Sequence, residues 1–160
     1  MIIVPYNRQA AIDYAGVWAF KRNPAYYNFD SLGGDCTNFA SQCLYAGSEV
    51  MNHKKVYGWY YYSINNRTPS WTGVPYLYNF LVGNKGAGPF AEETDRYHVQ
   101  PGDLVQFGTY DGYFYHSPVI VAVYDNEIFV AAHTDDAYMR PLSTYVYERA
   151  RFLKVLGVRK

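Results

Sequence analysis

The first part of the chain carries apolar residues at the spacing of an amphipathic helix. Ala11, Ala15 and Trp18 lie four and three positions apart, so a helix would place them on one face. Asn7 precedes this run and is a favourable residue for the N-cap position. The pattern therefore predicts a helix from Asn7 to about residue 20.

Two further helices are predicted downstream. One covers 36–46, with Asp35 at its N-cap position and Gly47 as the residue that ends it. The other covers 74–82, where apolar residues again recur on one stripe. The stretch 48–69 between them is aromatic and polar without a clear period, so we expect a long surface segment there.

After residue 100 the pattern changes to short β-branched apolar runs separated by turn residues. This pattern predicts strands at 103–107, 116–124, 127–133 and 151–156, the middle two forming a hairpin. Helices followed by strands are typical of an α+β domain. A length of 160 residues suits a single domain over 1–160, with N-terminal helices packed on a small, mostly antiparallel sheet.

Charge and hydropathy exclude several classes of protein. The 14 basic and 14 acidic side chains cancel and no long basic run occurs, which argues against a nucleic-acid partner. No stretch approaches the roughly 20 apolar residues of a membrane span. The start MIIVPYNRQ is too short in apolar residues for a secretory signal, so we expect cytoplasmic synthesis, with action at the cell envelope left open. We also expect a monomer.

The two cysteines, Cys36 and Cys43, are predicted to differ in role. Seven positions on one helix separate their Cα atoms by roughly 10 Å, too far for a disulfide. Cys36 would open the helix, where free backbone N–H groups and the helix dipole favour a thiolate and can hold an oxyanion. Cys43 lies two turns further in and is predicted to be a core residue.

A nucleophilic thiol needs a base, and the base needs a group that orients it. His116 begins an apolar strand and is the predicted base. His133 ends the neighbouring hairpin strand and is the predicted orienting residue, with Asp135 in reserve. A zinc site made of the two cysteines with His116 and His133 is disfavoured, because the spacings Cys-x6-Cys and His-x16-His suit no short zinc loop. No metal or cofactor is predicted.

Three blocks of the sequence, DCTNFASQCLYAG, PGDLVQF and YHSPVIVAVY followed by AAHT, resemble the bacterial putative amidase domain. That family is related to the NlpC/P60 and CHAP groups of papain-like cysteine peptidases. The resemblance implies a papain-like fold with Cys36 as nucleophile, His116 as base and His133 as orienting residue. It also implies a tyrosine near the oxyanion, for which Tyr27 is the nearest match and Tyr26 the alternative.

The resemblance further implies a substrate, namely the peptide or amide bonds of bacterial peptidoglycan. The chain has 19 Tyr, 9 Phe and 3 Trp, and such side chains can line a partly wet groove. Trp59, Tyr61, Trp71 and Tyr115 are the predicted walls of a substrate groove. Two alternatives stay open on the same fold: a non-catalytic cell-wall-binding module, and an acyltransferase in which an amine replaces water.

Overall fold

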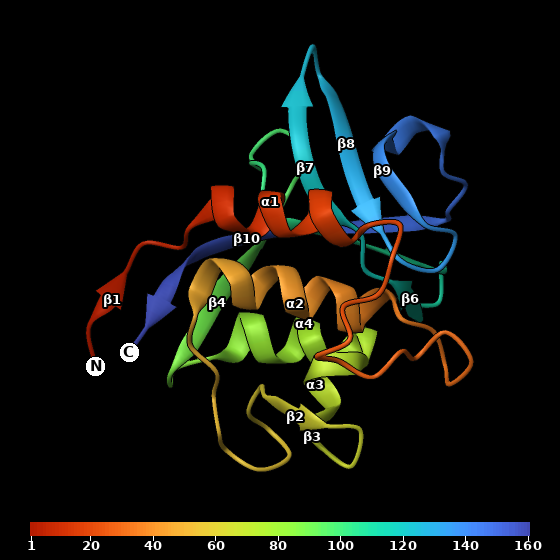
Figure 1. The fold of residues 1–160 in the computed structure, drawn as a ribbon. Coiled ribbons are helices and arrows are strands. Elements are labelled where there is room, and N and C mark those ends of the chain that lie inside the picture. Colours follow the sequence, from red (N-terminus) through yellow and green to blue (C-terminus); the bar gives the residue numbers. More distant parts are fainter.

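The predicted α+β architecture is confirmed in the computed structural model, which describes residues 1–160 (Figure 1). The helices are α1 (Arg8–Trp18), α2 (Cys36–Ser48), α3 (Pro69–Thr72) and α4 (Val74–Gly83), with one 3-10 turn, η1 (Leu142–Thr144). The strands are β1 (Ile3–Val4), β2 (Tyr61–Ser63), β3 (Asn66–Arg67), β4 (Gly88–Thr94), β5 (Leu104–Gly108), β6 (Phe114–His116), β7 (Val119–Tyr124), β8 (Glu127–Ala132), β9 (Ala137–Pro141) and β10 (Arg149–Arg159).

All strands except β2 and β3 form one antiparallel sheet. Its order is β1-β10-β5-β7-β8-β9, while β4 pairs with β10 and β6 pairs with β5. The 11-residue strand β10 pairs with β1, β4 and β5. Because β1 pairs with the end of β10, the two chain termini lie side by side (Figure 1).

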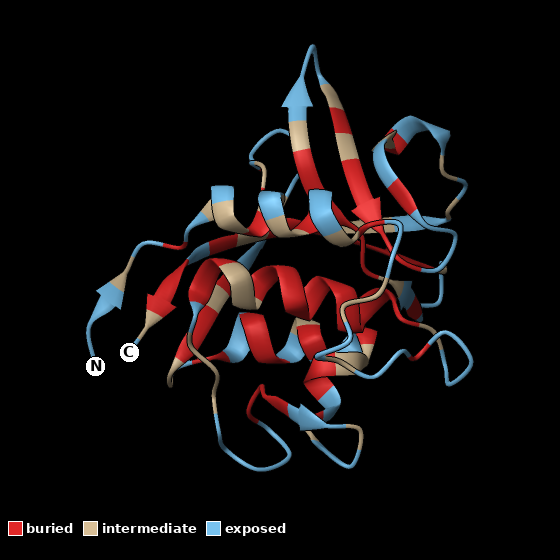
Figure 2. Cartoon of the chain, viewed as in Figure 1, coloured by how far each residue is buried: buried red, intermediate tan, exposed pale blue.

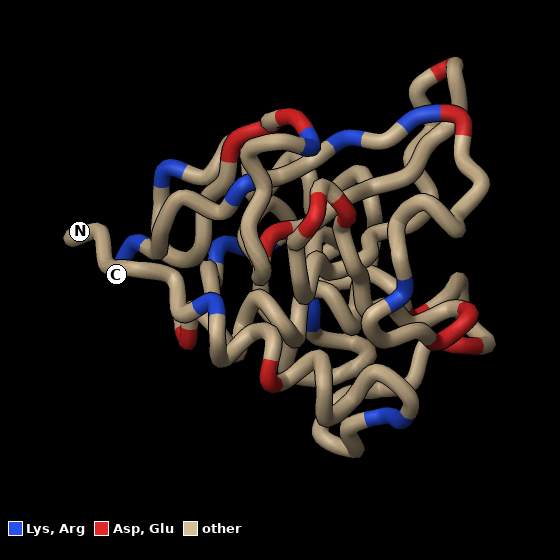
Figure 3. The backbone as a smooth tube through the Cα atoms, turned by 90° about the horizontal axis from the view of Figure 1, so that it is seen from above, with Lys and Arg blue, Asp and Glu red and all other residues tan.

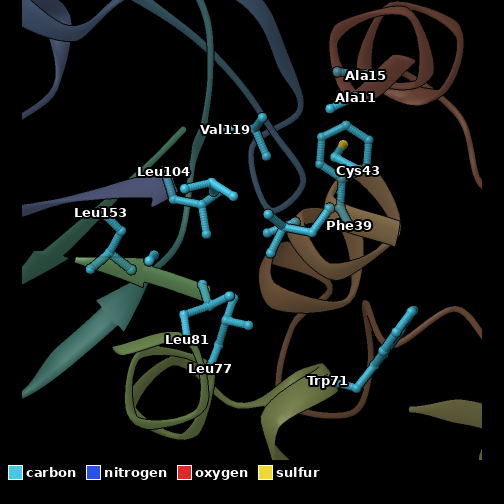
Figure 4. Close-up of a cluster of buried hydrophobic side chains, with 14 of the residues drawn as sticks. Ala11, Ala15, Phe39, Cys43, Trp71, Leu77, Leu81, Leu104, Val119 and Leu153 are labelled. Atoms are coloured by element: carbon cyan, nitrogen blue, oxygen red, sulfur yellow. The ribbon is translucent and has the colours of Figure 1, made fainter. Parts of the chain in front are cut away.

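The main hydrophobic core lies between the helices and one face of this sheet. Phe39 and Cys43 of α2 contribute to it from the helix side, and Leu104, Val119 and Leu153 contribute from the sheet (Figure 4). α2 is buried along most of its length, as Figure 2 shows, because α1, α3 and the sheet pack around it. Burial of such side chains is the main stabilising term in folding.

A second, smaller core lies on the opposite face of the sheet. Val105 and Phe107 of β5 belong to it, together with Ile120, Ile128 and Leu142. Strand side chains alternate between faces, so Leu104 and the side chain at 106 point toward the helices while 105 and 107 point away. The two cores therefore give the two faces of β5 different surroundings.

Several boundaries differ from the sequence-based prediction. Gly47 does not end α2 but lies inside it, where a Cβ atom would come within 2.4 Å of the Tyr6 ring, so the glycine allows this close approach. The helix ends instead at Glu49, whose φ is 56°. The predicted strand 116–124 is interrupted at Ser117 and Pro118, which separate β6 from β7.

The short elements α3, β1, β2 and β3 and the strands β4 and β9 were not predicted. β4 follows the predicted helix 74–82, and its GPFAEET sequence has Thr94 as its single β-branched residue, so it lacks the pattern that marks a strand. It forms because β10 offers it a full antiparallel partner. Tertiary pairing has overridden weak local propensity here.

Charged residues are spread along the whole chain (Figure 3). One ion pair is buried at the sheet: Asp103, fully buried, accepts a hydrogen bond from Arg8 at 2.7 Å. The same carboxylate accepts the Val155 backbone N–H at 2.9 Å. The pair thereby fixes the start of α1 to β10. No helix of the structure has the length and apolar character that a membrane span requires.

Candidate active site around Cys36

Cys36 is the first residue of α2, and only 8% of it is exposed. Its side chain packs with Val74 of α4 and Phe114 of β6. Burial raises the pKa of the Cys36 thiol, while the Thr37 hydroxyl and the backbone N–H groups of Ser117 and Thr37 act in the opposite direction. The sulfur is thus a protonated thiol at rest, surrounded by donors that would stabilise its ionised form.

A chain of hydrogen bonds leads away from this sulfur. The Thr37 hydroxyl lies 3.7 Å from the Cys36 sulfur and donates to the Ser117 hydroxyl at 3.4 Å. The Gln106 amide donates to the same Ser117 oxygen at 3.0 Å. Arg151 completes the chain with two bonds to the Gln106 side-chain oxygen, at 2.9 and 2.7 Å.

This arrangement lets the hydroxyl chain reverse its direction. In the thiol state Thr37 donates to Ser117, which already accepts from Gln106. On ionisation of Cys36, Thr37 can rotate its proton to the sulfur and accept one from Ser117 instead. This chain of hydrogen bonds can therefore supply one more hydrogen-bond donor to a thiolate at Cys36 than to a thiol.

Arg151 is the cation at the far end of the chain. Its guanidinium lies between the rings of Tyr78 and Phe114, 3.6 and 3.7 Å from their centroids. No salt bridge joins it to a carboxylate, and burial lowers its pKa. The positive charge is held in place by Gln106 and the rings, on the side of the sheet that faces Cys36.

His116 ends β6 rather than beginning a long strand. Its ring packs against Phe107 and Tyr145, with centroids 5.8 and 6.3 Å apart, and none of its nitrogens makes a hydrogen bond. Burial lowers the pKa of His116 to about 4, so the ring is neutral at pH 7. No hydrogen bond joins it to Cys36, and the two segments meet instead through the Thr37–Ser117 contact.

His133 has partners other than His116. Its Nδ1 lies 2.5 Å from a carboxylate oxygen of Asp35, and its Nε2 lies 2.8 Å from the Trp18 carbonyl oxygen. Both partners are hydrogen-bond acceptors, so the ring bridges the carboxylate and the carbonyl oxygen. The ring also stacks on Phe39 at 4.1 Å. Both side chains are almost completely buried, and Asp35 directly precedes Cys36 in the chain.

Asp35 occupies the predicted N-cap position but does not cap α2 through its side chain. Its carboxylate instead accepts from the Phe29 backbone N–H at 2.9 Å and from the Asn38 amide at 2.9 Å, in addition to His133. Burial alone would raise the pKa of Asp35, but these bonds lower it overall. The carboxylate therefore ties the loop at Phe29, the helix α2 and the end of β8 together.

The remaining predicted residues are placed as follows. Asp135 lies in an exposed turn after β8, with φ of 56°, and is one of the charges nearest His116. Tyr27 is 41% exposed, and its carbonyl oxygen accepts from Asn38 in the first turn of α2 at 3.0 Å. Tyr115 on β6 is 42% exposed. These three side chains can be reached from solvent near the two segments that carry Cys36 and His116.

Three of the predicted groove residues are core residues instead. Trp59 and Trp71 are completely buried, and Tyr61 is 8% exposed. The two indole N–H groups donate to Ser41 and Asn38 of α2 at 3.1 and 3.0 Å. These three rings thus pack in the core beside α2, and the prediction that they wall a groove is wrong. No alternation of apolar and polar residues in this part of the chain indicated that the rings are buried.

The polar residues behind Cys36 were also missed in the sequence. Gln106 interrupts the apolar strand DLVQF, and Arg151 opens the apolar run RFLKVL. A polar residue in a buried strand needs hydrogen-bond partners, so a polar residue within an apolar run was the signal that could have identified them. Cys43 is completely buried in the main core, as predicted. Nowhere do three or more His, Cys, Asp or Glu side chains gather as metal ligands.

Comparison with known proteins gives the family. The chain matches the putative amidase domain over residues 5–156, nearly its whole length. It belongs to this family. The family description points to amide hydrolysis as the activity.

A relative with a related sequence is the uncharacterized protein YhbB of Bacillus subtilis (strain 168). It is 34% identical over 139 residues, which make up 84% of this chain and 43% of YhbB. The chain thus spans less than half the length of that relative. No solved structure gives a significant match.

Proposed function

We propose that this putative amidase domain is a cysteine hydrolase in which Cys36 attacks the carbonyl carbon of an amide bond. The attack forms a tetrahedral intermediate, the amine departs with a proton, and a thioester remains on the sulfur. Water then attacks the thioester and releases the acid. The observation that carries this proposal is the position of the thiol at the start of α2, within reach of the Thr37 hydroxyl and the Ser117 N–H.

The same helix start supplies donors for the oxyanion. The first helical backbone bond of α2 runs from Phe39 N–H to the Asp35 carbonyl, so the N–H groups of residues 36–38 form no bond of this kind. The Cys36 N–H is the proposed donor to the oxyanion, and the helix dipole adds to its effect. Tyr27, which contacts this turn through Asn38, is the proposed side-chain contributor.

His116 is the proposed base. The other three histidines are engaged: His53 with Tyr62, His98 with Asp95, and His133 with Asp35 and Trp18. Neither nitrogen of the His116 ring makes a hydrogen bond, and the ring is neutral at pH 7 as a base must be. Because the ring lies against Phe107 and Tyr145, the proposal requires the side chain to turn toward the sulfur when substrate binds.

The proposed role of the His133–Asp35 pair is structural. The pair holds the loop and the first turn of α2 in place, without contacting the reacting atoms. His133 is therefore proposed as a positioning residue acting through α2 rather than through His116. Asp135 is the charged group that raises the proton affinity of His116, and it stays the candidate for orienting that ring.

The proposed substrate is an amide bond in bacterial peptidoglycan, which the sequence resemblance supports. The test is mass spectrometry of purified muropeptides after digestion by the wild type, Cys36→Ala and Cys43→Ala. The proposal expects new fragments with wild type and Cys43→Ala and none with Cys36→Ala. Cleavage by Cys36→Ala would contradict the mechanism, and failure of the wild type to cleave any muropeptide would contradict the substrate.

Acyl transfer is the second candidate, because an amine can take the place of water at the thioester. Adding an amine such as glycine ethyl ester to the same digestion separates the two activities. A hydrolase yields the free acid as the main product, whereas an acyltransferase yields the new amide.

A further inference from the structure

A groove runs along the face of α4 that is turned away from Cys36. A cavity of 560 Å³ contacts Tyr76, Phe80 and Gly83, which recur four and three positions apart on one face of the helix. Val74, which packs against Cys36, and Tyr78, which stacks on Arg151, lie on the opposite face. The groove is therefore separate from the surroundings of the thiol.

The walls of the cavity are two loops that hold each other in place. The Asn52 amide donates to the Ala87 carbonyl at 3.0 Å, and the Asn84 amide donates to the Ala87 and Pro89 carbonyls at 3.1 and 2.9 Å. These amides are satisfied by the protein itself. The loops thus form a fixed frame rather than a surface that must order on binding.

Other polar groups on the walls have no partner in the protein. Lys54 and Lys85 are exposed, and neither ammonium group makes a salt bridge or hydrogen bond. The Asn79 amide and the hydroxyls of Tyr57 and Tyr76 are equally free, with the two tyrosines 78% and 56% exposed. The free groups are cationic, amide and phenolic, and they converge on one cavity.

The groove continues past Tyr76 into a second hollow of 340 Å³ that contains Arg67. This guanidinium donates to the Thr72 hydroxyl at 3.1 Å and to the Ile64 carbonyl, and it lies 4.6 Å from the centroid of the Phe29 ring, without a carboxylate partner. No Asp or Glu lines either hollow. Three unpaired cations along one groove are a local excess in a chain whose formal net charge is zero.

We propose that this groove is a second binding site, for an acidic oligosaccharide. Lys54, Lys85 and Arg67 would pair with its carboxylate or phosphate groups. The exposed faces of Tyr57 and Tyr76 suit the C–H faces of sugar rings, and Asn79 suits their hydroxyls. Nucleic-acid binding uses many phosphate contacts. Three cations without a wider basic surface are too few to make them.

The site does not depend on the proposed hydrolysis at Cys36. Its occupancy would hold the domain on an anionic glycan while leaving the thiol free. Loss of activity and loss of glycan binding are therefore separable, and Cys36→Ala should bind the glycan like the wild type.

Isothermal titration calorimetry with defined glycans tests this proposal. A hyaluronan hexasaccharide presents carboxylates, a glycerol-phosphate oligomer presents phosphates, and chitohexaose presents neither. Binding of one or both acidic probes, with weak or no binding of chitohexaose, is expected, and the stronger acidic probe identifies the natural anion. Affinity should fall as salt rises, because exposed ion pairs are screened.

The double variant Lys54→Ala/Lys85→Ala should weaken binding of the acidic probe about tenfold, since two exposed ion pairs are lost. Lys55→Ala is the matched control, because this neighbouring exposed lysine does not line the cavity. Equal effects of the two changes would overturn the assignment of the groove. Tight binding of chitohexaose, tighter binding of single-stranded oligothymidylate, or no binding of any acidic probe would overturn the proposed ligand class.

Discussion

The two cysteines of α2 share one helix but have opposite surroundings. Cys43, in the middle of the helix, is completely buried among apolar side chains and has no polar neighbour that would stabilise a charge. Cys36, in the first turn, faces a hydroxyl, two backbone N–H groups and, behind them, Gln106 and Arg151. Burial raises the pKa of both thiols, but only at Cys36 do hydrogen-bond donors from other parts of the chain counteract it.

This difference shows that the place of a thiol in a helix matters less than what the fold brings to it. The helix start supplies free N–H groups by itself. The donors from Gln106 of β5, Ser117 of the β6–β7 connection and Arg151 of β10 lie about 70 to 115 positions later in the chain.

Removing the first thiol should abolish amide hydrolysis. Cys36→Ala is expected to lower kcat at least about a thousandfold, because no other group can form the thioester. Cys43→Ala should keep kcat within about threefold and lower the free energy of unfolding by about 1–2 kcal/mol, because it leaves a small cavity in the core. Steady-state kinetics and urea unfolding of both variants measure this. A similar loss of activity in the two variants would remove the contrast.

Breaking the buried pair in front of Cys36 should destabilise the domain. His133→Ala leaves the Asp35 carboxylate buried without its main partner, and we expect a loss of about 3–5 kcal/mol in the free energy of unfolding. The Asp35 carboxylate has a lowered pKa, so its stabilising contribution is present above pH 4 and is lost as the pH falls further. Urea unfolding at pH 7 and pH 3 checks both statements. A wild-type and a His133→Ala protein of equal stability at pH 7 would refute the role of the pair.

The free energy of unfolding should also depend on pH through His116, in a higher pH range than through Asp35. Its pKa is about 4 in the folded state and 6.5 in the unfolded chain, so the unfolded chain binds a proton that the folded protein does not between these values. The free energy of unfolding should therefore fall as the pH drops from 6.5 to 4, by up to about 3 kcal/mol. His116→Gln should remove this part of the pH dependence. If the wild type and the variant give parallel curves, His116 is not the buried neutral group described here.

The hydroxyl next to the sulfur should have a smaller, specific effect. Thr37→Val removes the donor that can turn to the thiolate, and we expect roughly tenfold slower alkylation of Cys36 and a raised thiol pKa. Thr37→Ser keeps the hydroxyl and is the matched control. The pH dependence of the alkylation rate measures the pKa directly. An unchanged profile in Thr37→Val would show that the hydroxyl chain does not tune the thiol.

Local sequence patterns were sufficient for part of this structure. The helix start at Cys36 could be predicted because Asp35 and the preceding glycines mark it, and the hairpin of β7 and β8 follows from its β-branched runs. The buried state of Cys43 follows from the helical stripe. These features depend on neighbours in the sequence, which is why pattern analysis finds them.

The features set by distant contacts could not be predicted in this way. Trp59 and Trp71 look like surface aromatics in a polar segment, and only their contacts with α2 bury them. His133 bonds to Asp35 rather than to His116 because the end of β8 lies at the start of α2. Such partnerships arise from the packing of the sheet against the helices, and no spacing in the chain encodes them.

The most direct test of the Cys36 assignment is alkylation with substoichiometric iodoacetamide, followed by peptide mapping and an activity assay on the same sample. The account predicts that the label appears on the peptide containing Cys36, that Cys43 stays unlabelled in the folded protein, and that amidase activity falls in proportion to the label. Labelling of Cys43 first, or full activity after Cys36 has been alkylated, would contradict it.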